Sequence, residues 1–391
     1  METSTDSGLP LMSEGFPLEP PFAREIGRVF GGQAGPTLIV VAGIHGNEPA
    51  GYEAARRVLA RLSGEDIPLR GELVVLAGNV GALHAGVRHI NKDLNRVWSE
   101  SSIAALRTRA SADRDAEDNE QLALLDALDA VFSRARGPVH LADLHTSSAR
   151  GIPFVIFGDT LAQRRFVRAF PIPIIIGLEE QVDGVLAQYG TRRGAISFSV
   201  EGGQHEDAGA RDNLEAVLWI ALAEAHLIAK DACPEIAEAV KHLDERRAGL
   251  PRVLEVLGRR AIEPSDAFAM EPGFRNLEPA KRGQLLARDR RGDIRAESDG
   301  VVILPLYQKL GSDGFFWGRA VSERRLRLTE LLRQLPLDQL LAYLPGVTRD
   351  PEKSTRFIVD TRIARLFALE VFHLLGYRRV RECGRALTVE K

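Results

Sequence analysis

The stretch TLIVVAGIHGNE at residues 37–48 decides the fold of this chain. Its continuous apolar run predicts a strand that is buried on both faces, and the glycine-flanked histidine that follows leads into a helix. His45 and Glu48 lie three residues apart in this turn, so an imidazole nitrogen and a carboxylate can reach one cation from a single rigid segment. Half of a metal site is therefore predicted here.

A third metal ligand has to come from another part of the chain. The best candidate is His145, which stands at the end of a second apolar run, residues 139–144. Two histidines, one glutamate and an open position describe a catalytic zinc site rather than a structural one. One zinc ion per chain is expected, although cobalt, manganese or iron can occupy similar donors.

Apolar runs alternate with helical patterns over the first 230 residues. Strands are predicted at 37–44, 72–80, 139–145, 153–158, 172–177 and 195–201, and helices at 49–62, 121–134 and 212–229. This alternation predicts an α/β fold with a mixed, largely parallel sheet. Loops at the carboxyl ends of such strands build the functional site, and His45, His145 and Glu201 all fall at such ends.

The rest of the chain is predicted to contain separate segments. We expect a flexible leader at 1–22, a catalytic domain at 23–230 with a polar surface excursion at 99–120, and a linker at 231–250. Short strand patterns between glycine and aspartate turns predict a small β domain at 251–321. Helical periodicity at 322–343 and 356–375 predicts a helical tail over 322–391, with one strand near 377–388.

Composition limits the classes of partner. The chain has 391 residues, 45% hydrophobic and 27% charged, with a formal net charge of -3. This balance is that of an ordinary globular protein and gives no electrostatic reason to expect nucleic acid or an anionic membrane. Two cysteines, far apart, indicate no disulfide framework, and no run is long enough to span a bilayer, so a cytoplasmic protein with a small-molecule substrate is predicted. An oligomer is compatible with these data.

Four motifs occur in a characteristic order: GIHGNEPAG at 43–51, RHINKDLNRVW at 88–98, DLHTSS at 143–148 and FSVEGG at 198–203. Together they resemble the succinylglutamate desuccinylase and aspartoacylase branch of the zinc carboxypeptidase superfamily. The resemblance implies a three-layer α/β/α domain in which His45, Glu48 and His145 hold zinc. It also implies that Glu201 is the catalytic carboxylate, that Arg88 polarises the scissile carbonyl, and that Asn95 and Arg96 hold a substrate carboxylate.

Elementary chemistry assigns similar roles to these residues. A carboxylate beside zinc-activated water can take its proton and pass it to a leaving amine, which suits Glu201 at the end of its strand. Arg88 can supply charge and fixed donors to an oxyanion, and the Asn95-Arg96 pair suits the capture of a carboxylate. Asp93 and Asp143 are equally compatible with orienting a ligating imidazole and with capping local backbone.

Further substrate contacts are harder to place. Related proteins carry a substrate-contacting Tyr and Arg before the Glu201 strand, where this chain has Tyr189 and Arg192 with imperfect spacing. They also supply a Tyr from the β domain, where this chain reads GSDGFFW at 311–317. This departure argues against an aspartate-derived substrate, and the two phenylalanines are compatible with a less polar pocket.

The sequence therefore predicts a zinc-dependent amidohydrolase that cleaves a small N-acyl amino acid, a deacylase, with ester hydrolysis also possible. The β domain is expected to act as a cap that favours small substrates over polypeptides. A zinc carboxypeptidase, an esterase and a non-catalytic metal-binding protein stay open as alternatives. A general base is unnecessary in a binding protein, and Glu201 therefore favours an enzyme.

Overall fold

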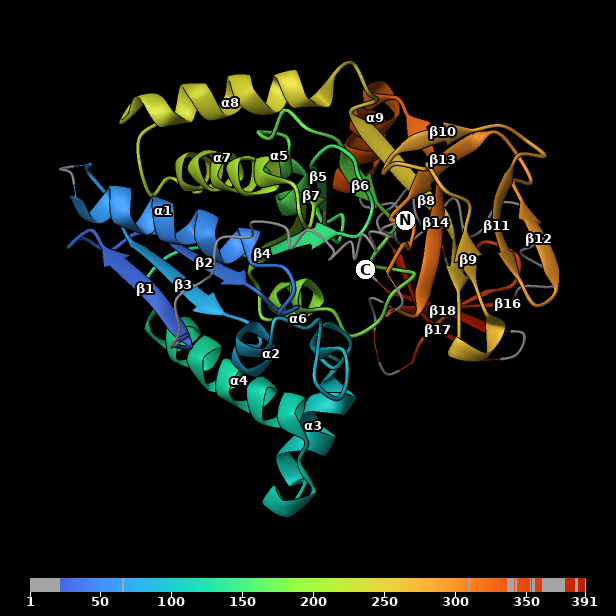
Figure 1. Ribbon diagram of the computed structural model, residues 1–391, viewed down its shortest axis with the longest axis horizontal. Coiled ribbons are helices and arrows are strands. Elements are labelled where there is room, and N and C mark those ends of the chain that lie inside the picture. Colours follow the sequence, from blue (N-terminus) through green and yellow to red (C-terminus); the bar gives the residue numbers. More distant parts are fainter. Residues whose placement is uncertain are drawn as a thin grey trace, which may run out of the picture.

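The computed structural model describes residues 22–391 except 65–66, 309, 336–340, 342, 352, 354–355, 361–376, 384–385 and 391. An eleven-stranded mixed sheet runs through it in the order β1-β3-β2-β4-β7-β5-β6-β8-β14-β13-β10 (Figure 1). The predicted α/β class with a mixed sheet is thus confirmed. No described helix combines the length and apolar character needed to cross a membrane.

Four parallel strands form the part of the sheet that positions the site. They are β3 (Glu72–Ala77), β2 (Thr37–Ala42), β4 (Val139–Ser147) and β7 (Ile196–Gln204). On one side β1 (Glu25–Phe30) pairs antiparallel with β3. On the other side β5 (Phe154–Ile156) runs antiparallel to β7 and parallel to β6 (Ile174–Ile176). All six predicted strands are present, whereas β1 was not predicted.

Helices cover both faces of this sheet, as Figure 1 shows. Leu38, Val40 and Ala42 of β2 belong to the core under α1 (Ala50–Gly64) and α7 (Ala208–Glu224), whereas Ile39 and Val41 belong to the core under α4 (Ala116–Arg134). Successive side chains of a strand point to opposite faces, so a strand that is apolar throughout requires a layer on each side. The three-layer arrangement follows.

The second half of the chain continues the same sheet. β8 (Val253–Ala261) pairs parallel with β6, and β14 (Asp313–Val321), β13 (Gly300–Ile303) and β10 (Glu278–Ala280) follow antiparallel. A separate three-stranded sheet consists of β9 (Ala269–Met270), β11 (Leu285–Asp289) and β12 (Gly292–Arg295). The expected β domain is therefore joined edge to edge with the catalytic sheet.

The remaining helices are short or lie at the periphery. They are α2 (Val80–Ala85), η1 (Leu94–Arg96), α3 (Glu100–Thr108), η2 (Ser111–Asp113), α5 (Leu161–Val167), α6 (Leu186–Arg192), α8 (Pro234–Arg247), η3 (Pro264–Asp266) and α9 (Glu323–Gln334).

Two segments predicted as irregular are helical. The segment at 99–120 contains α3, which is capped by Ser99 and buries Ile103 and Leu106, and α4 begins five residues before the predicted start. The predicted linker at 231–250 is mostly α8, which has a proline in its first turn and buries Ile236 and Leu243. In both helices few apolar residues reach the core, so their periodicity in the sequence is weak.

The two ends of the chain also differ from expectation. Residues 1–21 of the predicted leader lie outside the described residues, but Phe22 is buried and packs edge-on against Tyr52. Among the described residues, the predicted helical tail is helical in α9 and at Leu341. It is followed by an antiparallel sheet of β15 (Val347–Arg349), β16 (Arg356–Asp360), β18 (Ala386–Glu390) and β17 (Arg378–Cys383). Residues 361–375 of the second predicted helix lie outside the described residues.

Candidate metal centre

Three adjacent parallel strands end at the same edge and carry the candidate metal centre. β4 lies between β2 and β7, and in this register Ala42 is opposite Leu144 while His145 is opposite Glu201. The turn after β2 is tightly packed, because a Cβ atom at Gly46 would lie 2.0 Å from the backbone of Ala82. Only glycine fits there, which fixes the turn that presents His45.

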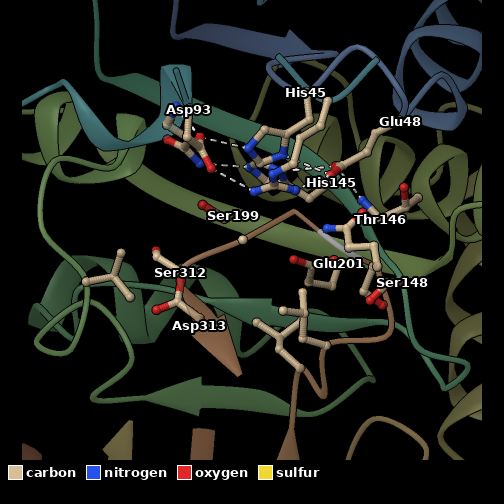
Figure 2. Close-up of a pocket in the computed structure, with 18 of the residues that line it drawn as sticks. His45, Glu48, Asp93, His145, Thr146, Ser148, Ser199, Glu201, Ser312 and Asp313 are labelled. Carbon is tan, nitrogen blue, oxygen red and sulfur yellow. Dashed lines mark hydrogen bonds and ion pairs between the residues drawn. The ribbon is translucent and has the colours of Figure 1, made fainter. Parts of the chain in front are cut away.

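The structure brings His45, Glu48 and His145 together. Each offers one donor atom, and these atoms all lie within 4.8 Å of one another. Glu48 lies between the two imidazoles, with Oε1 2.8 Å from Nδ1 of His45 and Oε2 3.3 Å from Nδ1 of His145 (Figure 2). All three side chains are buried. Two imidazoles and a carboxylate at this spacing fit a catalytic zinc ion that keeps one position for a non-protein ligand.

Two further carboxylates orient the imidazoles. Asp93 Oδ1 lies 3.0 Å from Nε2 of His45, and Asp143 Oδ2 lies 2.8 Å from Nε2 of His145. Because an ionised carboxylate only accepts hydrogen bonds, each Nε2 carries a hydrogen that it donates to its aspartate, which leaves Nδ1 as the atom that each imidazole would offer to a cation. This carboxylate–imidazole arrangement is typical of metal centres. Asp93 also caps η1 by accepting a hydrogen bond from the Asn95 backbone, so both roles considered for it are present.

The ionisable groups of the metal-free centre are strongly coupled. Burial by itself would raise the pKa of the Glu48 carboxyl, but His45 and His145 hold it well below its usual value. Burial would likewise lower the pKa of His145, yet Asp143 and Glu48 raise it well above the usual value. The metal-free centre therefore retains a proton that a bound cation would displace, which makes metal affinity increase with pH.

Glu201 lies beside this centre and has the properties of a proton acceptor. Burial raises the pKa of its carboxyl to about 8, with the charge of Glu48 adding to the effect and His145 opposing it. Its Oε2 atom is buried and has no hydrogen-bond partner among the described residues. A buried carboxylate oxygen without a partner requires a water or a ligand. A bound dication would lower this pKa toward neutrality.

Arg88 points into the same space from the loop before η1. It donates from Nη2 to Asp93 Oδ2 at 2.8 Å and from Nη1 to Glu48 Oε1 at 3.5 Å, while its buried Nε has no partner among the described residues. Burial would lower the pKa of Arg88, but Asp93 and Glu48 raise it, so the guanidinium stays charged. The loop is tied to the His45 turn by a hydrogen bond from Gly46 N to Arg88 O.

Asn95 and Arg96 also lie in the cavity wall. The side chain of Asn95 is engaged by the protein, since Oδ1 accepts from the backbone of Leu186 at 2.8 Å and Nδ2 lies 3.4 Å from Asp143. Arg96 donates to Asp313 of β14 at 2.8 Å. The structure thus places both residues at the site, where Asn95 supports the Asp143–His145 pair and Arg96 already has a carboxylate partner.

Tyr189 and Arg192 are not among the described residues that line the cavity. Tyr189 packs against Trp98 in the core beneath α4, and its hydroxyl accepts from Arg193 at 2.7 Å. Arg192 donates to the backbone carbonyl of Trp98 at 2.5 Å. The contacts of both side chains are with the protein core rather than the cavity, and their predicted role as substrate ligands stays a prediction.

Glu117 supports the site but was not predicted. This fully buried carboxylate in the first turn of α4 accepts hydrogen bonds from the backbone of Ile90 at 2.7 Å and Asn91 at 2.8 Å, and from the Asn79 side chain at 3.1 Å. It thereby holds the loop that carries Arg88 and Asp93. Glu117 falls in the segment interpreted as a surface excursion, and no local pattern distinguishes it from the other acidic residues there.

The far wall of the cavity comes from the second half of the chain. Figure 2 shows Ser312 and Asp313 across the pocket from His45 and His145, with Glu201 near Thr146 and Ser148. Apolar side chains dominate the remaining wall: Ile156, Leu178, Val182, Val185, Leu304 and Phe316. The expectation that a phenylalanine of the 311–317 segment lines a less polar pocket holds for Phe316, whereas Phe315 packs in the core near β9 and β11.

Comparisons with known proteins agree with this geometry. A model of the succinylglutamate desuccinylase/aspartoacylase catalytic domain matches residues 34–226. The succinylglutamate desuccinylase of Burkholderia thailandensis is 30% identical over 273 residues, which cover 66% of this chain and 71% of that protein. The succinylglutamate desuccinylase of Pseudomonas syringae pv. tomato is 26% identical over 288 residues, covering 70% and 76%.

Two solved structures share the fold. The succinylglutamate desuccinylase of Chromobacterium violaceum aligns with a TM-score of 0.54 and 19% identity, covering 75% of this chain and 88% of that one. The ectoine utilization protein EutE (DoeB) of Ruegeria pomeroyi aligns with a TM-score of 0.53 and 21% identity, again covering 75% and 88%. Fold, motif order and sequence similarity lead to one assignment: the chain belongs to the succinylglutamate desuccinylase/aspartoacylase family.

Proposed function

We propose that this protein is a zinc-dependent hydrolase that cleaves the amide bond of a small N-acyl amino acid. The observation that carries the proposal is the convergence of His45, Glu48 and His145 beside Glu201, whose Oε2 has no partner among the described residues. A metal-binding protein without catalysis has no use for a buried free carboxylate at this position, because leaving such a group unpaired costs stability.

The metal ligands, Glu201 and Arg88 have different roles in the proposed reaction. A zinc ion held by the three donors would lower the pKa of a water ligand to about 7 and so supply a nucleophile near neutral pH. Glu201 accepts a proton from the attacking water and gives it to the departing nitrogen, so that the products are a carboxylate and a free amine. Arg88 donates hydrogen bonds to the carbonyl oxygen as negative charge develops there.

The surroundings support a small substrate rather than a polypeptide. The far wall, from Leu304 to Asp313, comes from the second half of the chain and faces the metal ligands across the cavity. Arg96 of η1, which contacts this wall through Asp313, is the candidate for binding the substrate carboxylate, as in the predicted role. An esterase would use the same groups, since no described residue of the cavity distinguishes a departing oxygen from a departing nitrogen.

The proposal is tested with protein that has been stripped of metal and reloaded with one equivalent of zinc. Release of amine from N-acetyl, N-succinyl and longer N-acyl amino acids is measured for the stripped and reloaded forms, with the matching O-acyl hydroxy acids tested in parallel. We expect amine release that requires zinc. Zinc-loaded protein that releases no amine from any of these compounds would contradict the proposal, and turnover of only the O-acyl compounds would assign an esterase instead.

A further inference from the structure

Both Nη atoms of Arg96 are already hydrogen-bonded within the protein, and only its buried Nε has no partner among the described residues. Its Nη2 donates to Asp313 Oδ2 at 2.8 Å, and the other oxygen of Asp313 accepts from Nε of Arg259 on β8. Arg259 is held in turn by the backbone carbonyl of Gln181, 3.1 Å from Nη1. Asp313 is a mostly buried carboxylate between two arginines, and it occupies a place at Arg96 where a substrate carboxylate would otherwise bind.

Acidic side chains outnumber arginines in the cavity lining. Among the lining residues that the structure describes, the carboxylates are Glu48, Asp93, Glu179, Glu201 and Asp313, and the arginines are Arg88 and Arg96. Both lining arginines are already bound to carboxylates, Arg88 to Asp93 and Arg96 to Asp313.

Glu179 is one of the acidic side chains in the cavity lining that have no arginine partner among the described residues. It follows β6 and contributes to the cavity wall beside Leu178, and its buried Oε1 has no hydrogen-bond partner among the described residues. A substrate carboxylate placed near Glu179 would find no cationic partner there, and taking a charge out of water without a partner is costly. The neighbouring apolar side chains, including Val182 and Phe316, instead favour an uncharged group.

We propose that Asp313 is a specificity-determining residue that restricts the substrate to an N-acyl amino acid with one carboxylate and an uncharged, apolar acyl group. This inference rests on the proposed function. Arg96, Asp313 and Arg259 together carry one excess positive charge, which one substrate carboxylate neutralises. An acyl group with its own terminal carboxylate, such as succinyl, would meet Asp313 or Glu179, while the charge of each lining arginine is already paired with a carboxylate of the protein.

The test compares three ligands that differ only at the end of the acyl chain: N-butanoyl, N-succinyl and N-succinamoyl alanine. Their affinities are measured by calorimetry on zinc-loaded Glu201→Gln protein, in which turnover is blocked. We expect the butanoyl compound to bind roughly tenfold or more tightly than the succinyl compound, with the uncharged succinamoyl compound between them, because like charges repel in a closed cavity.

Two variants change this preference in opposite directions. Adding Asp313→Asn should narrow the butanoyl-to-succinyl affinity ratio by roughly tenfold, whereas adding Arg259→Gln should widen it, since each alters the local charge by one unit with opposite sign. Misfolding cannot produce both results. Asp293→Asn, which removes an exposed carboxylate of β12 that lies outside the cavity lining, should leave the ratio unchanged.

Equal or tighter binding of the succinyl compound in the Glu201→Gln protein would overturn the inference, and so would a ratio that Asp313→Asn leaves unchanged. Turnover separates this inference from the function on which it rests. Wild-type protein that hydrolyses both compounds with equal kcat/KM would support the amidohydrolase and overturn the selection. Protein that shows the expected binding ratios but hydrolyses neither compound would refute the amidohydrolase and support the selection by charge.

Discussion

The edge formed by β2, β4 and β7 and the wall opposite it, residues 304–316, are built differently. At the edge, each imidazole contacts Glu48 on one side and a second carboxylate on the other. The opposite wall is largely apolar, and its one carboxylate is bound by arginines. The edge therefore fixes donors for a cation and a reaction, whereas the wall determines which substrates can approach them.

The largest effect is expected at the edge, where Glu201 acts on the reacting atoms. Glu201→Gln should lower kcat by roughly 10² or more, because an amide cannot accept and return a proton, while zinc stays bound at one equivalent. Turnover and metal content are measured on the same preparation. Wild-type turnover in zinc-loaded Glu201→Gln protein would exclude Glu201 as the general base.

A smaller effect is expected at Asp143, which contacts the predicted metal ligand His145. Asp143→Asn should weaken zinc affinity by roughly 10- to 100-fold, since the amide no longer fixes the His145 tautomer or increases its basicity. Affinity is measured by competition with a chelator, and Asp293→Asn serves as a control with the same change of charge far from the edge. Equal zinc affinity in both variants would show that Asp143 does not orient the ligand.

The smallest effect concerns stability and involves Glu179, a residue of the cavity lining outside both the edge and the opposite wall. Burial raises the pKa of Glu179 to about 7 from 4.5, with Glu180 adding to the effect and Arg192 opposing it. Between pH 4.5 and pH 7, Glu179 therefore holds a proton in the folded protein that it has lost in the unfolded chain. The stabilisation is complete below the unfolded pKa and is lost as pH rises through the folded one.

Metal-free wild-type protein should accordingly lose about 1–3 kcal/mol of unfolding free energy from this group between pH 5 and pH 8. Glu179→Gln should remove that part of the pH dependence, and Glu238→Gln on the exposed face of α8 should leave it intact. Urea unfolding at the two pH values measures the difference. The same loss in all three proteins would show that Glu179 is not protonated in the fold.

The edge could be predicted from the sequence to a large extent, and the wall could not. His45, His145 and Glu201 each follow an apolar run, and the ends of adjacent parallel strands necessarily lie together. Asp313 is 217 positions from Arg96 along the chain, and its pairing depends on how β14 joins β8 and on how that sheet continues from β6. No local pattern encodes such a long-range contact.

The elements that were mispredicted have weak local signals. The tail strand β16 alternates buried Phe357 and Val359 with exposed Ile358, a period of two that is hard to separate from a helical pattern over five residues. Helix α8 carries a proline in its first turn and buries three residues, Ile236, Ala239 and Leu243. Its helical spacing is present in the sequence, but the polar composition of the segment masks it.

The central claim is that three donors from two strand ends bind one divalent ion. X-ray diffraction from crystals of the zinc-loaded protein, with anomalous data at the zinc edge, tests it most directly. We expect a single zinc ion bound by Nδ1 of His45, Nδ1 of His145 and the carboxylate of Glu48, and loss of this ion in His45→Ala protein. Zinc bound at other residues, or full occupancy of the site in His45→Ala protein, would contradict the account.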